Sequence, residues 1–255
     1  MNYIDTHTHL FLPEFDMDRD QVIANAKNAG VEKVLLPNVD SHTILPLLEL
    51  SSKYPDFCLP MIGLHPTSVN ENFEQELEMV ESWLKKQKFY AIGEIGIDLY
   101  WDKTFLKQQE VAFKYQINLA KKYDLPIIIH ARDSFDEIFN IVEREIDSSL
   151  KGIFHAFTGN LEQAKQIIDW GFFIGIGGIV TFKNSHLRDV IKKIDINHLV
   201  LETDSPYLAP VPYRGKRNES AYIQIIAQKI AEIKEISLDE VAQITTSNAK
   251  KRFKI

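Results

Sequence analysis

Eight short apolar runs alternate with longer amphipathic segments along this chain of 255 residues, and the alternation constrains the fold more than any other feature. The segments between the runs have the apolar spacing of helices, as in 103–122, where Phe113 and Ile117 recur on one face. Alternating strands and helices form parallel βαβ units, and eight such units can close into a barrel. We therefore predict an α/β fold, a single (β/α)8 TIM barrel, with its last helices at about 219–234 and 238–247. The apolar runs begin near Tyr3, Lys33, Phe57, Tyr90, Pro126, Gly152, Phe172 and His198.

We expect this barrel to be one domain over residues 1–255. Hydrophobic residues make up 45% of the chain, which is enough for one large core. No linker rich in proline, glycine or serine divides the sequence. The most loop-like segment, 205–218, contains Pro206, Pro210 and Pro212 and follows the eighth predicted strand, where barrels place functional loops.

Composition narrows the class of protein. Cys58 is the only cysteine, so an internal disulfide is impossible, and we interpret it as a buried strand residue. The sequence contains neither a signal-peptide pattern nor an apolar stretch approaching ~20 residues, so we expect no membrane span. We expect a cytoplasmic monomer without an obligate protein partner. The formal net charge of −7 has the wrong sign for binding nucleic acid through phosphate contacts alone, unless metal ions supply local positive charge.

Side chains that can bind metals follow six of the eight apolar runs. Because the C-terminal ends of parallel barrel strands meet at one mouth, residues far apart in the sequence become neighbours there. His7 and His9 are two positions apart, so strand alternation directs both imidazoles to the same side. The residues at the predicted strand ends are His7 and His9, His65, Glu94 and Asp98, His130, His155, and Glu202 and Asp204.

This set of residues predicts a metal site. Imidazole suits zinc, iron and nickel, and carboxylate oxygens also suit magnesium and manganese, so the residues leave the ion open. Their number exceeds the three or four ligands of one catalytic zinc, and we therefore predict two divalent ions (Mg, Mn or Zn) with one bridging carboxylate. We interpret Asp98 as a group that stabilises the loop or a ligand. Strand alternation turns Glu202 away from its neighbours, and we interpret it as either an outward-facing group or one that supports a metal ligand from behind. We interpret His42, His186 and His198 as structural.

A series of ordered motifs covers nearly the whole chain. They are D-T-H-T-H-L at 5–10, G-L-H-P at 63–66, G-E-I-G-I-D at 93–98, H-A-R-D at 130–133, H-A-F-T-G at 155–159, G-I-V-T-F-K-N at 178–184, E-T-D-S-P-Y-L-A-P at 202–210 and R-G-K-R-N-E at 214–219. In these motifs the chain resembles the TatD family of metal-dependent deoxyribonucleases, within the amidohydrolase-like barrel superfamily. That family often has cysteine where Ala156 stands and proline where Ser220 stands, and neither position is a predicted metal ligand.

The resemblance implies a centre in which six residues hold two metal ions and Glu94 bridges both. Asp204 would also act as the acid/base partner of the water between the ions, which makes Asp204 and Glu94 the implied catalytic residues. His65 would face the substrate, together with parts of the segment 214–219. The first ion would be bound by His7, His9 and Asp204, and the second by His130 and His155.

The function implied is hydrolysis of phosphodiester bonds by a metal-activated water, as in a deoxyribonuclease of the 3′–5′ exonuclease type that acts on DNA. Two alternatives stay open: hydrolysis of amide or ester bonds in a small molecule, and a non-catalytic metal-binding scaffold. Tyr100 and Trp101 could stack on a base or pack under the next helix. Cations in mouth-side loops are candidate phosphate contacts, with a solvated charge or a structural ion pair as the alternative for each. They are Arg132, Lys183, Arg214, Lys216 and Arg217.

Overall fold

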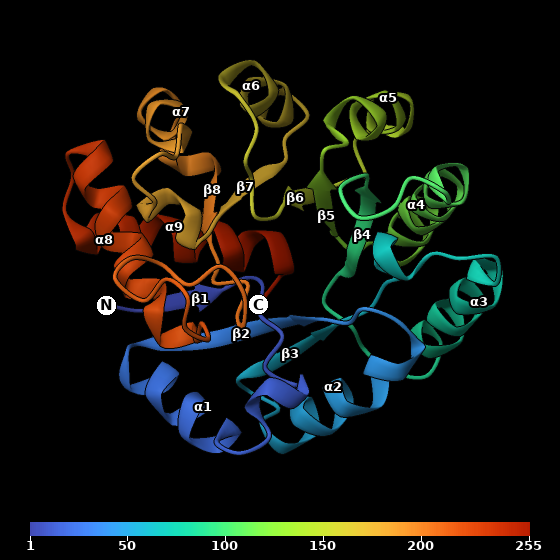
Figure 1. Ribbon diagram of the computed structural model, residues 1–255, viewed down its shortest axis with the longest axis horizontal. Coiled ribbons are helices and arrows are strands. Elements are labelled where there is room, and N and C mark those ends of the chain that lie inside the picture. Colours follow the sequence, from blue (N-terminus) through green and yellow to red (C-terminus); the bar gives the residue numbers. More distant parts are fainter.

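The computed structural model describes residues 1–255, in which eight parallel strands alternate with nine α-helices. The strands form a central ring and the helices surround it (Figure 1). Each apolar run of the sequence contains or adjoins one strand, which confirms the predicted α/β barrel. The strands are β1 (Tyr3–Asp5), β2 (Val31–Pro37), β3 (Cys58–Met61), β4 (Ile92–Asp98), β5 (Ile127–Arg132), β6 (Gly152–Phe154), β7 (Phe173–Ile176) and β8 (Leu199–Leu201).

The ring consists of two sheets, one of β1, β2 and β3 and one of β4 to β8, which meet at two seams. At the β8–β1 seam the amide of Asp204 donates to the carbonyl of His7 over 2.8 Å. At the β3–β4 seam the amide of Gly93 donates to the carbonyl of Ile62, also over 2.8 Å. These short sets of backbone bonds close the barrel. Isolated parallel bridges pair Thr8 with Ser205 and Ile62 with Ile92.

Strand alternation divides the core into an interior and an outer layer. Ile128 of β5 belongs to a small cluster inside the ring, whereas its neighbours Ile127 and Ile129 belong to the large cluster between strands and helices. The helix α9 (Leu238–Phe253) contributes Ala249 and Phe253 to the inner cluster, and it lies behind the ring of strands in Figure 1. This helix covers the end of the barrel opposite the mouth. The strand-side members of the inner cluster are Ile4, Leu35, Leu59, Met61, Ala91, Ile128, Ile153, Phe173 and Val200.

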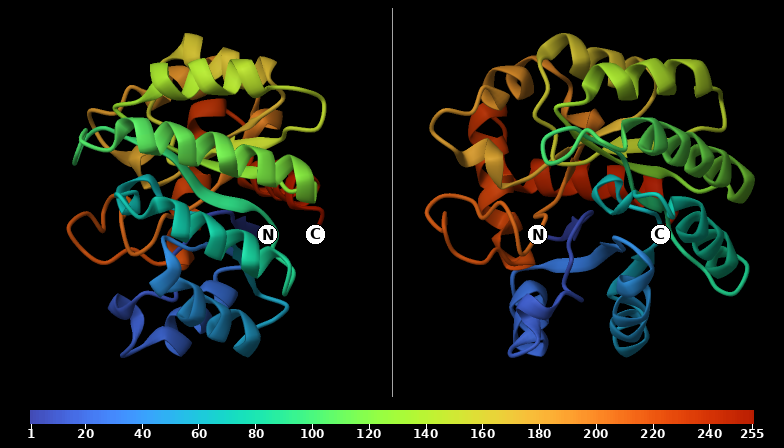
Figure 2. Two further views of the ribbon diagram at one scale, coloured as in Figure 1. Left: turned by 90° about the vertical axis from the view of Figure 1, so that its right-hand side faces the viewer. Right: turned by 45° about the vertical axis from the view of Figure 1, so that its right-hand side comes forward.

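The outer helices bury their apolar faces against the strands. Three of them, α3, α4 and α5, lie side by side along one flank (Figure 2). The helices are α1 (Arg19–Asn28), α2 (Ser41–Lys53), α3 (Phe73–Leu84), α4 (Leu106–Tyr123), α5 (Phe135–Glu145), α6 (Leu161–Asp169), α7 (Leu187–Lys193) and α8 (Ile223–Lys234), followed by α9. Short 3-10 turns span Pro13–Phe15, Pro66–Ser68, Gly178–Thr181, Ile196–His198 and Ser220–Tyr222.

The last helix is longer than the 238–247 that the sequence predicts, because its final turns have tertiary partners. Asn248 donates to the carbonyl of Leu199 and Arg252 donates to the carbonyl of Gly171, each over 2.7 Å. By contrast, 205–218 contains neither helix nor strand, as expected.

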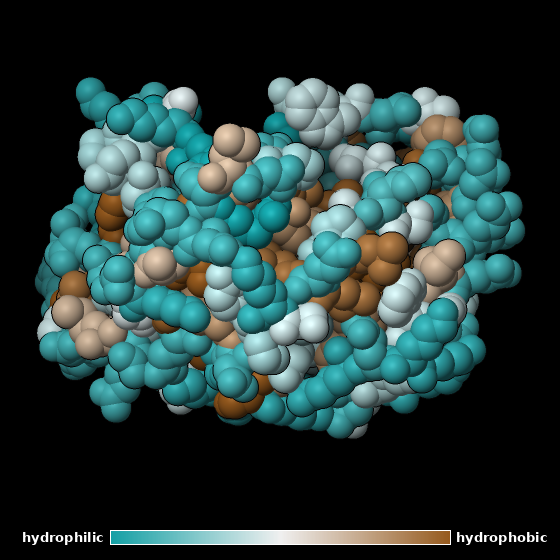
Figure 3. All heavy atoms as spheres, turned by 90° about the horizontal axis from the view of Figure 1, so that it is seen from below, coloured by the Kyte–Doolittle hydropathy of each residue, from teal (hydrophilic) through white to brown (hydrophobic).

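The outer surface of the helices is polar. On the side of α1 and α2 most of the visible surface is hydrophilic, with smaller hydrophobic areas between (Figure 3). None of the helices combines the length and the apolar character that crossing a lipid bilayer requires.

Candidate metal centre

The side chains that the sequence predicts as metal ligands lie together at the barrel mouth. Glu94 and His130 belong to β4 and β5, and His155 directly follows β6. His7 and His9 follow β1, and Asp204 follows β8. Most of them are nearly inaccessible: the side chains of His7 and Glu94 are 0% and 3% exposed, while that of Asp204 is 13% exposed.

A first group of donor atoms surrounds one oxygen of Glu94. The Nε2 atoms of His7 and His9 lie 3.3 Å apart, and Oε2 of Glu94 lies 3.1 Å from the first and 3.8 Å from the second. Oδ1 of Asp204 lies 3.5 Å from Nε2 of His9 and 3.7 Å from Nε2 of His7. Both predicted imidazoles of the first strand therefore converge on one point together with two carboxylates.

A second group surrounds the other oxygen of the same carboxylate. Oε1 of Glu94 lies 2.6 Å from Nε2 of His155 and 2.8 Å from Nδ1 of His130. His65, which the resemblance places toward the substrate, has its Nε2 atom 3.3 Å from this oxygen. Glu94 thus divides its two oxygens between two sets of imidazoles.

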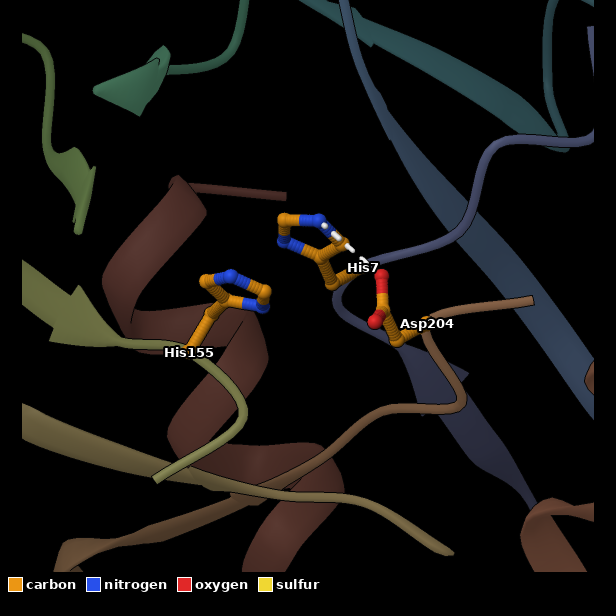
Figure 4. Close-up of side chains that lie close together, drawn as sticks. All are labelled: His7, His155 and Asp204. Atoms are coloured by element: carbon orange, nitrogen blue, oxygen red, sulfur yellow. Dashed lines mark ion pairs between the residues drawn. The ribbon is translucent and has the colours of Figure 1, made fainter. Parts of the chain in front are cut away.

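The two groups also contact each other directly. The rings of His7 and His155 stack with their centroids 3.9 Å apart and their planes 10° from parallel. Figure 4 shows these two imidazoles and the carboxylate of Asp204 facing one space from three different loops. The imidazoles and carboxylates of the two groups therefore form one continuous cluster.

Buried charges strongly perturb the acids of this cluster. Burial alone would raise the pKa of Glu94, but His155, His65 and His7 outweigh burial and hold that pKa well below its ordinary value. Burial also opposes ionisation of Asp204, yet hydrogen bonding to His9 and the charges of His7 and His155 lower the pKa of its carboxyl. Both acids are therefore carboxylates at neutral pH.

The imidazoles of the cluster differ from one another. Burial lowers the pKa of His7, and the neighbouring His155 lowers it further. Burial also disfavours the charged form of His155, but Glu94 and Glu202 raise the pKa of that imidazole well above its ordinary value. In the absence of a bound ion, the pKa values of these two stacked imidazoles are therefore shifted in opposite directions.

The donor set fits divalent metal ions. Three combinations of side chains each bring one ligand atom per residue within 4.8 Å of one another. Facing imidazole nitrogens such as those of His7 and His9 offer lone pairs to a common point, which a cation between them would satisfy. The three combinations are His7, His155 and Asp204; His7, His9 and Glu94; and His65, Glu94 and His130.

Asp98 and Glu202 lie beside two of the predicted metal ligands, His130 and His155. Oδ2 of Asp98 lies 2.8 Å from Nε2 of His130, while its Oδ1 accepts from the backbone amides after β4, so this residue stabilises both a ligand and the loop. Glu202 is fully buried and accepts a hydrogen bond from the amide of Ala156, with Oε1 3.5 Å from Nδ1 of His155. Of the two alternatives for Glu202, an outward-facing group and a group that supports a ligand, its place beside His155 fits the second. Because β8 ends at Leu201, strand alternation does not extend to it.

Sequence reasoning missed Asp5 as a structural member of the site. Its carboxylate accepts from the amide of Thr203 over 2.9 Å and from the hydroxyl of the same residue over 2.6 Å, and it lies 3.3 Å from the amide of His7. Burial raises the pKa of Asp5 to about 7. The only available signal was its place at the start of the D-T-H-T-H motif.

The cations of the mouth-side loops fall into two kinds. Arg217 forms a bidentate ion pair with Asp18, with donor–acceptor distances of 2.7 and 2.8 Å. Arg132 and Arg214 lack hydrogen-bonding partners and instead stack on aromatic rings, with their guanidinium carbons 3.8 Å from the ring centre of Tyr100 and 4.0 Å from that of Phe182. The stacked arginines keep their N–H groups available, whereas Arg217 fastens its loop.

Arg214 also borders a pocket of about 350 Å³ on the mouth side. Lys183 lines the same pocket from the loop after β7, and Thr158 lines it from the loop after β6. In TIM barrels, loops at the C-terminal ends of the last strands often bind phosphate groups. Lys216, by contrast, lies only near the ring of Tyr213, 6.0 Å from its centre.

Comparison with known proteins connects this cluster with hydrolases. The family model described as TatD-related DNase matches residues 4–254. The uncharacterized metal-dependent hydrolase YabD of Bacillus subtilis is 41% identical over 252 residues, which cover 98% of each chain.

Solved structures show the same relation. The crystal structure of the TatD homologue YjjV from Escherichia coli is 31% identical, covers 99% of this chain and 98% of its own, and superposes with a TM-score of 0.93. That of a TatD-family hydrolase from Entamoeba histolytica is 26% identical, with 99% and 98% coverage and a TM-score of 0.85. The similarity extends over the whole barrel.

Proposed function

This chain belongs to the family of TatD-related DNases, which makes it a metal-dependent hydrolase, and from this premise we propose that it cleaves phosphodiester bonds of DNA as a 3′–5′ exonuclease. The observation that carries the proposal is the divided carboxylate of Glu94, whose two oxygens face two sets of imidazoles. A carboxylate placed in this way suits a bridging ligand between two metal ions, the arrangement that supports in-line displacement at phosphorus.

Six residues would hold two ions of magnesium, manganese or zinc. When bound, such ions supply Lewis-acid stabilisation of phosphoryl oxygens and lower the pKa of a water molecule. The first ion would lie among His7, His9 and Asp204, and the second between His130 and His155, with Glu94 between them.

Asp204 is the proposed proton acceptor for the attacking water. Its side chain is 13% exposed, compared with 3% for Glu94, so it is the more accessible of the two carboxylates. The lowered pKa keeps Asp204 ionised at neutral pH and therefore able to accept a proton. Glu94, held among imidazoles on both sides, stays in place as a ligand.

Unpaired cations around the mouth support a phosphate-bearing substrate. Arg132, Arg214 and Lys183 have no ion-pair partner, and Arg214 and Lys183 share the pocket beside the β7 loop. A polyanion would supply the missing partners. His65 would face the substrate from the loop after β3, where Nδ1 of its ring is fixed by the hydroxyl of Thr67 at 2.7 Å.

The test is a panel of Mg, Mn and Zn against single-stranded DNA, duplex DNA, RNA, a generic phosphodiester and small amides and esters. We expect DNA hydrolysis in the wild type and loss of at least about 1,000-fold in Asp204→Asn, which lacks both the proton acceptor and a carboxylate ligand of the first ion. Asp56→Asn, an exposed acid before β3, is the matched control and should keep full activity. If the protein hydrolyses small amides or esters and no DNA, the proposal is wrong and the substrate is a small molecule.

A further inference from the structure

Two large aromatic side chains extend from the loop between β4 and α4. Tyr100 is 54% exposed and Trp101 is 70% exposed, so neither packs under the following helix, which was one of the two expected roles. Their rings stand edge to face, 4.9 Å apart and 89° to each other. The two rings therefore present apolar surface to solvent beside the barrel mouth, where aromatic faces are available to a ligand.

The loop is fastened to the metal centre by one carboxylate. Oδ1 of Asp98 accepts from the amides of Tyr100 and Trp101, over 3.0 and 3.3 Å, and Oδ2 of the same side chain lies 2.8 Å from Nε2 of His130. Gln109 of α4 holds Asp98 from behind, accepting from its amide over 2.9 Å. The side chain of Asp98 therefore connects the backbone of Tyr100 and Trp101 directly with His130, a proposed metal ligand.

Arg132 joins the two rings from the next strand. Its guanidinium carbon lies 3.8 Å from the ring centre of Tyr100 and 5.3 Å from that of Trp101. Contact with the rings uses none of the guanidinium hydrogens, and no acceptor of the chain contacts them. Arg132 therefore lies beside both rings with its N–H groups free.

We propose that Tyr100, Trp101 and Arg132 form a subsite for one unpaired nucleobase and its phosphate beside the bond that is cut. The base would stack on the indole of Trp101, since the ring of Tyr100 is perpendicular to it and already lies against Arg132, and the free N–H groups of Arg132 would bind the adjoining phosphate. This proposal rests on the proposed function. A base within a duplex is already stacked on both faces, so the subsite takes a base only from a single strand or an unpaired end.

The first experiment measures hydrolysis of two single-stranded oligonucleotides, one complete and one lacking the base at the terminal nucleotide. With the complete strand, Trp101→Ala should raise KM by roughly fivefold or more, and Trp101→Phe should restore most of the loss. With the abasic strand, wild type and Trp101→Ala should agree within twofold. An equal rise in KM for both strands, or no rise for either, would overturn the subsite.

The second experiment separates this subsite from the activity itself. In Asp204→Asn, binding of oligothymidine should quench tryptophan fluorescence, and Trp101→Phe in that background should abolish the quenching. Trp83→Phe, a tryptophan of α3 away from the mouth, is the matched control and should leave the quenching intact. If the wild type cleaves no DNA while quenching in the Asp204→Asn background depends on Trp101, the proposed function is removed and the subsite is retained. Quenching unchanged by Trp101→Phe would remove the subsite alone.

Discussion

The carboxylate of Glu202 fills the space that a side chain on Gly175 would require. A Cβ atom at position 175 would overlap Oε2 of Glu202, while Oε1 of the same group faces Nδ1 of His155 at 3.5 Å. The absence of a side chain in β7 therefore makes room for a buried acid beside His155, and we expect this acid to orient the imidazole in the candidate metal centre. Groups that orient metal-binding histidines commonly change metal affinity when they are displaced.

Gly175→Ala should lower metal affinity by about 10- to 100-fold, because the new methyl group displaces Glu202 and with it the ring of His155. Competition with a chelating dye measures the affinity, and circular dichroism checks the fold. Gly177→Ala is the control, since the nearest atom to a Cβ there lies 3.7 Å away. Equal metal affinity in the two variants would show that Glu202 does not orient His155.

Removal of metal should lower the melting temperature. Without cations, two carboxylates and several imidazoles remain buried together, and an ion that binds only the folded chain stabilises it by mass action. At an ion concentration 100 times Kd the gain is about 2.7 kcal/mol. Thermal scans with EDTA and with increasing zinc or manganese measure this, and the shift should shrink in His130→Ala. A melting temperature unaffected by every ion would argue against a metal centre in the folded chain.

Two arginines of one loop should differ in what they control. Arg217→Ala should reduce the free energy of unfolding by up to about 1 kcal/mol, since it removes a half-exposed ion pair with Asp18. Arg214→Ala should leave stability unchanged, raise KM for DNA and reduce the slope of log affinity against log salt by about one. Urea unfolding and binding at several salt concentrations separate these effects. The assignment fails if Arg214→Ala leaves the salt slope of the wild type.

The ion pair between α3 and α4 should make the stability of the fold depend on pH in the acid range. Glu81 accepts from Lys122 over 2.8 Å and from the hydroxyl of Tyr115 over 2.9 Å, and these hydrogen bonds lower its pKa to about 2. Because the pKa of Glu81 is lower in the folded chain than its ordinary value of 4.5, the ionised carboxylate stabilises the fold at pH values above 4.5. This stabilisation is lost as the pH falls from 4.5 toward 2.

Glu81→Gln should therefore be less stable than the wild type at pH 6 by at most about 1 kcal/mol, with the difference shrinking below pH 4.5. Urea unfolding across this range measures the difference. Glu78→Gln, an exposed acid of the same helix without an ion pair, should show no such trend. A constant difference between wild type and Glu81→Gln down to pH 2.5 would contradict the assignment.

The barrel and the ends of its strands could be predicted because both depend on short-range pattern. Alternation of apolar runs and amphipathic segments is local, and a parallel barrel then brings strand ends such as His7 and His155 to one mouth. The end of α9 could not be predicted in this way, since Asn248 and Arg252 look like surface residues in the sequence. Their hydrogen bonds to distant carbonyls exist only in the assembled fold.

The same limit applies to the charged residues around the site. Arg217 and Arg214 lie in one motif, yet only one finds a carboxylate, and that carboxylate is Asp18, far away in the sequence. The orientation of Glu202 likewise depends on where β8 ends, which apolar pattern does not define to a single residue. The sequence shows which charged residues lie near the site, but it does not show which ion-pair or hydrogen-bond partner each of them has.

The two seams of the barrel give the metal centre a mechanical role. His7 and His9 extend from the three-stranded sheet, whereas His130 and His155 extend from the five-stranded sheet, and Glu94 and Asp204 lie beside the two lines where these sheets meet. Ions held by all six residues would cross-link the sheets at the mouth, where regular strand pairing is interrupted. The chain without metal should then open first at the two seams, with faster amide exchange at Asp204 and Gly93. Binding of the metal ions would in this way also stabilise the closed barrel.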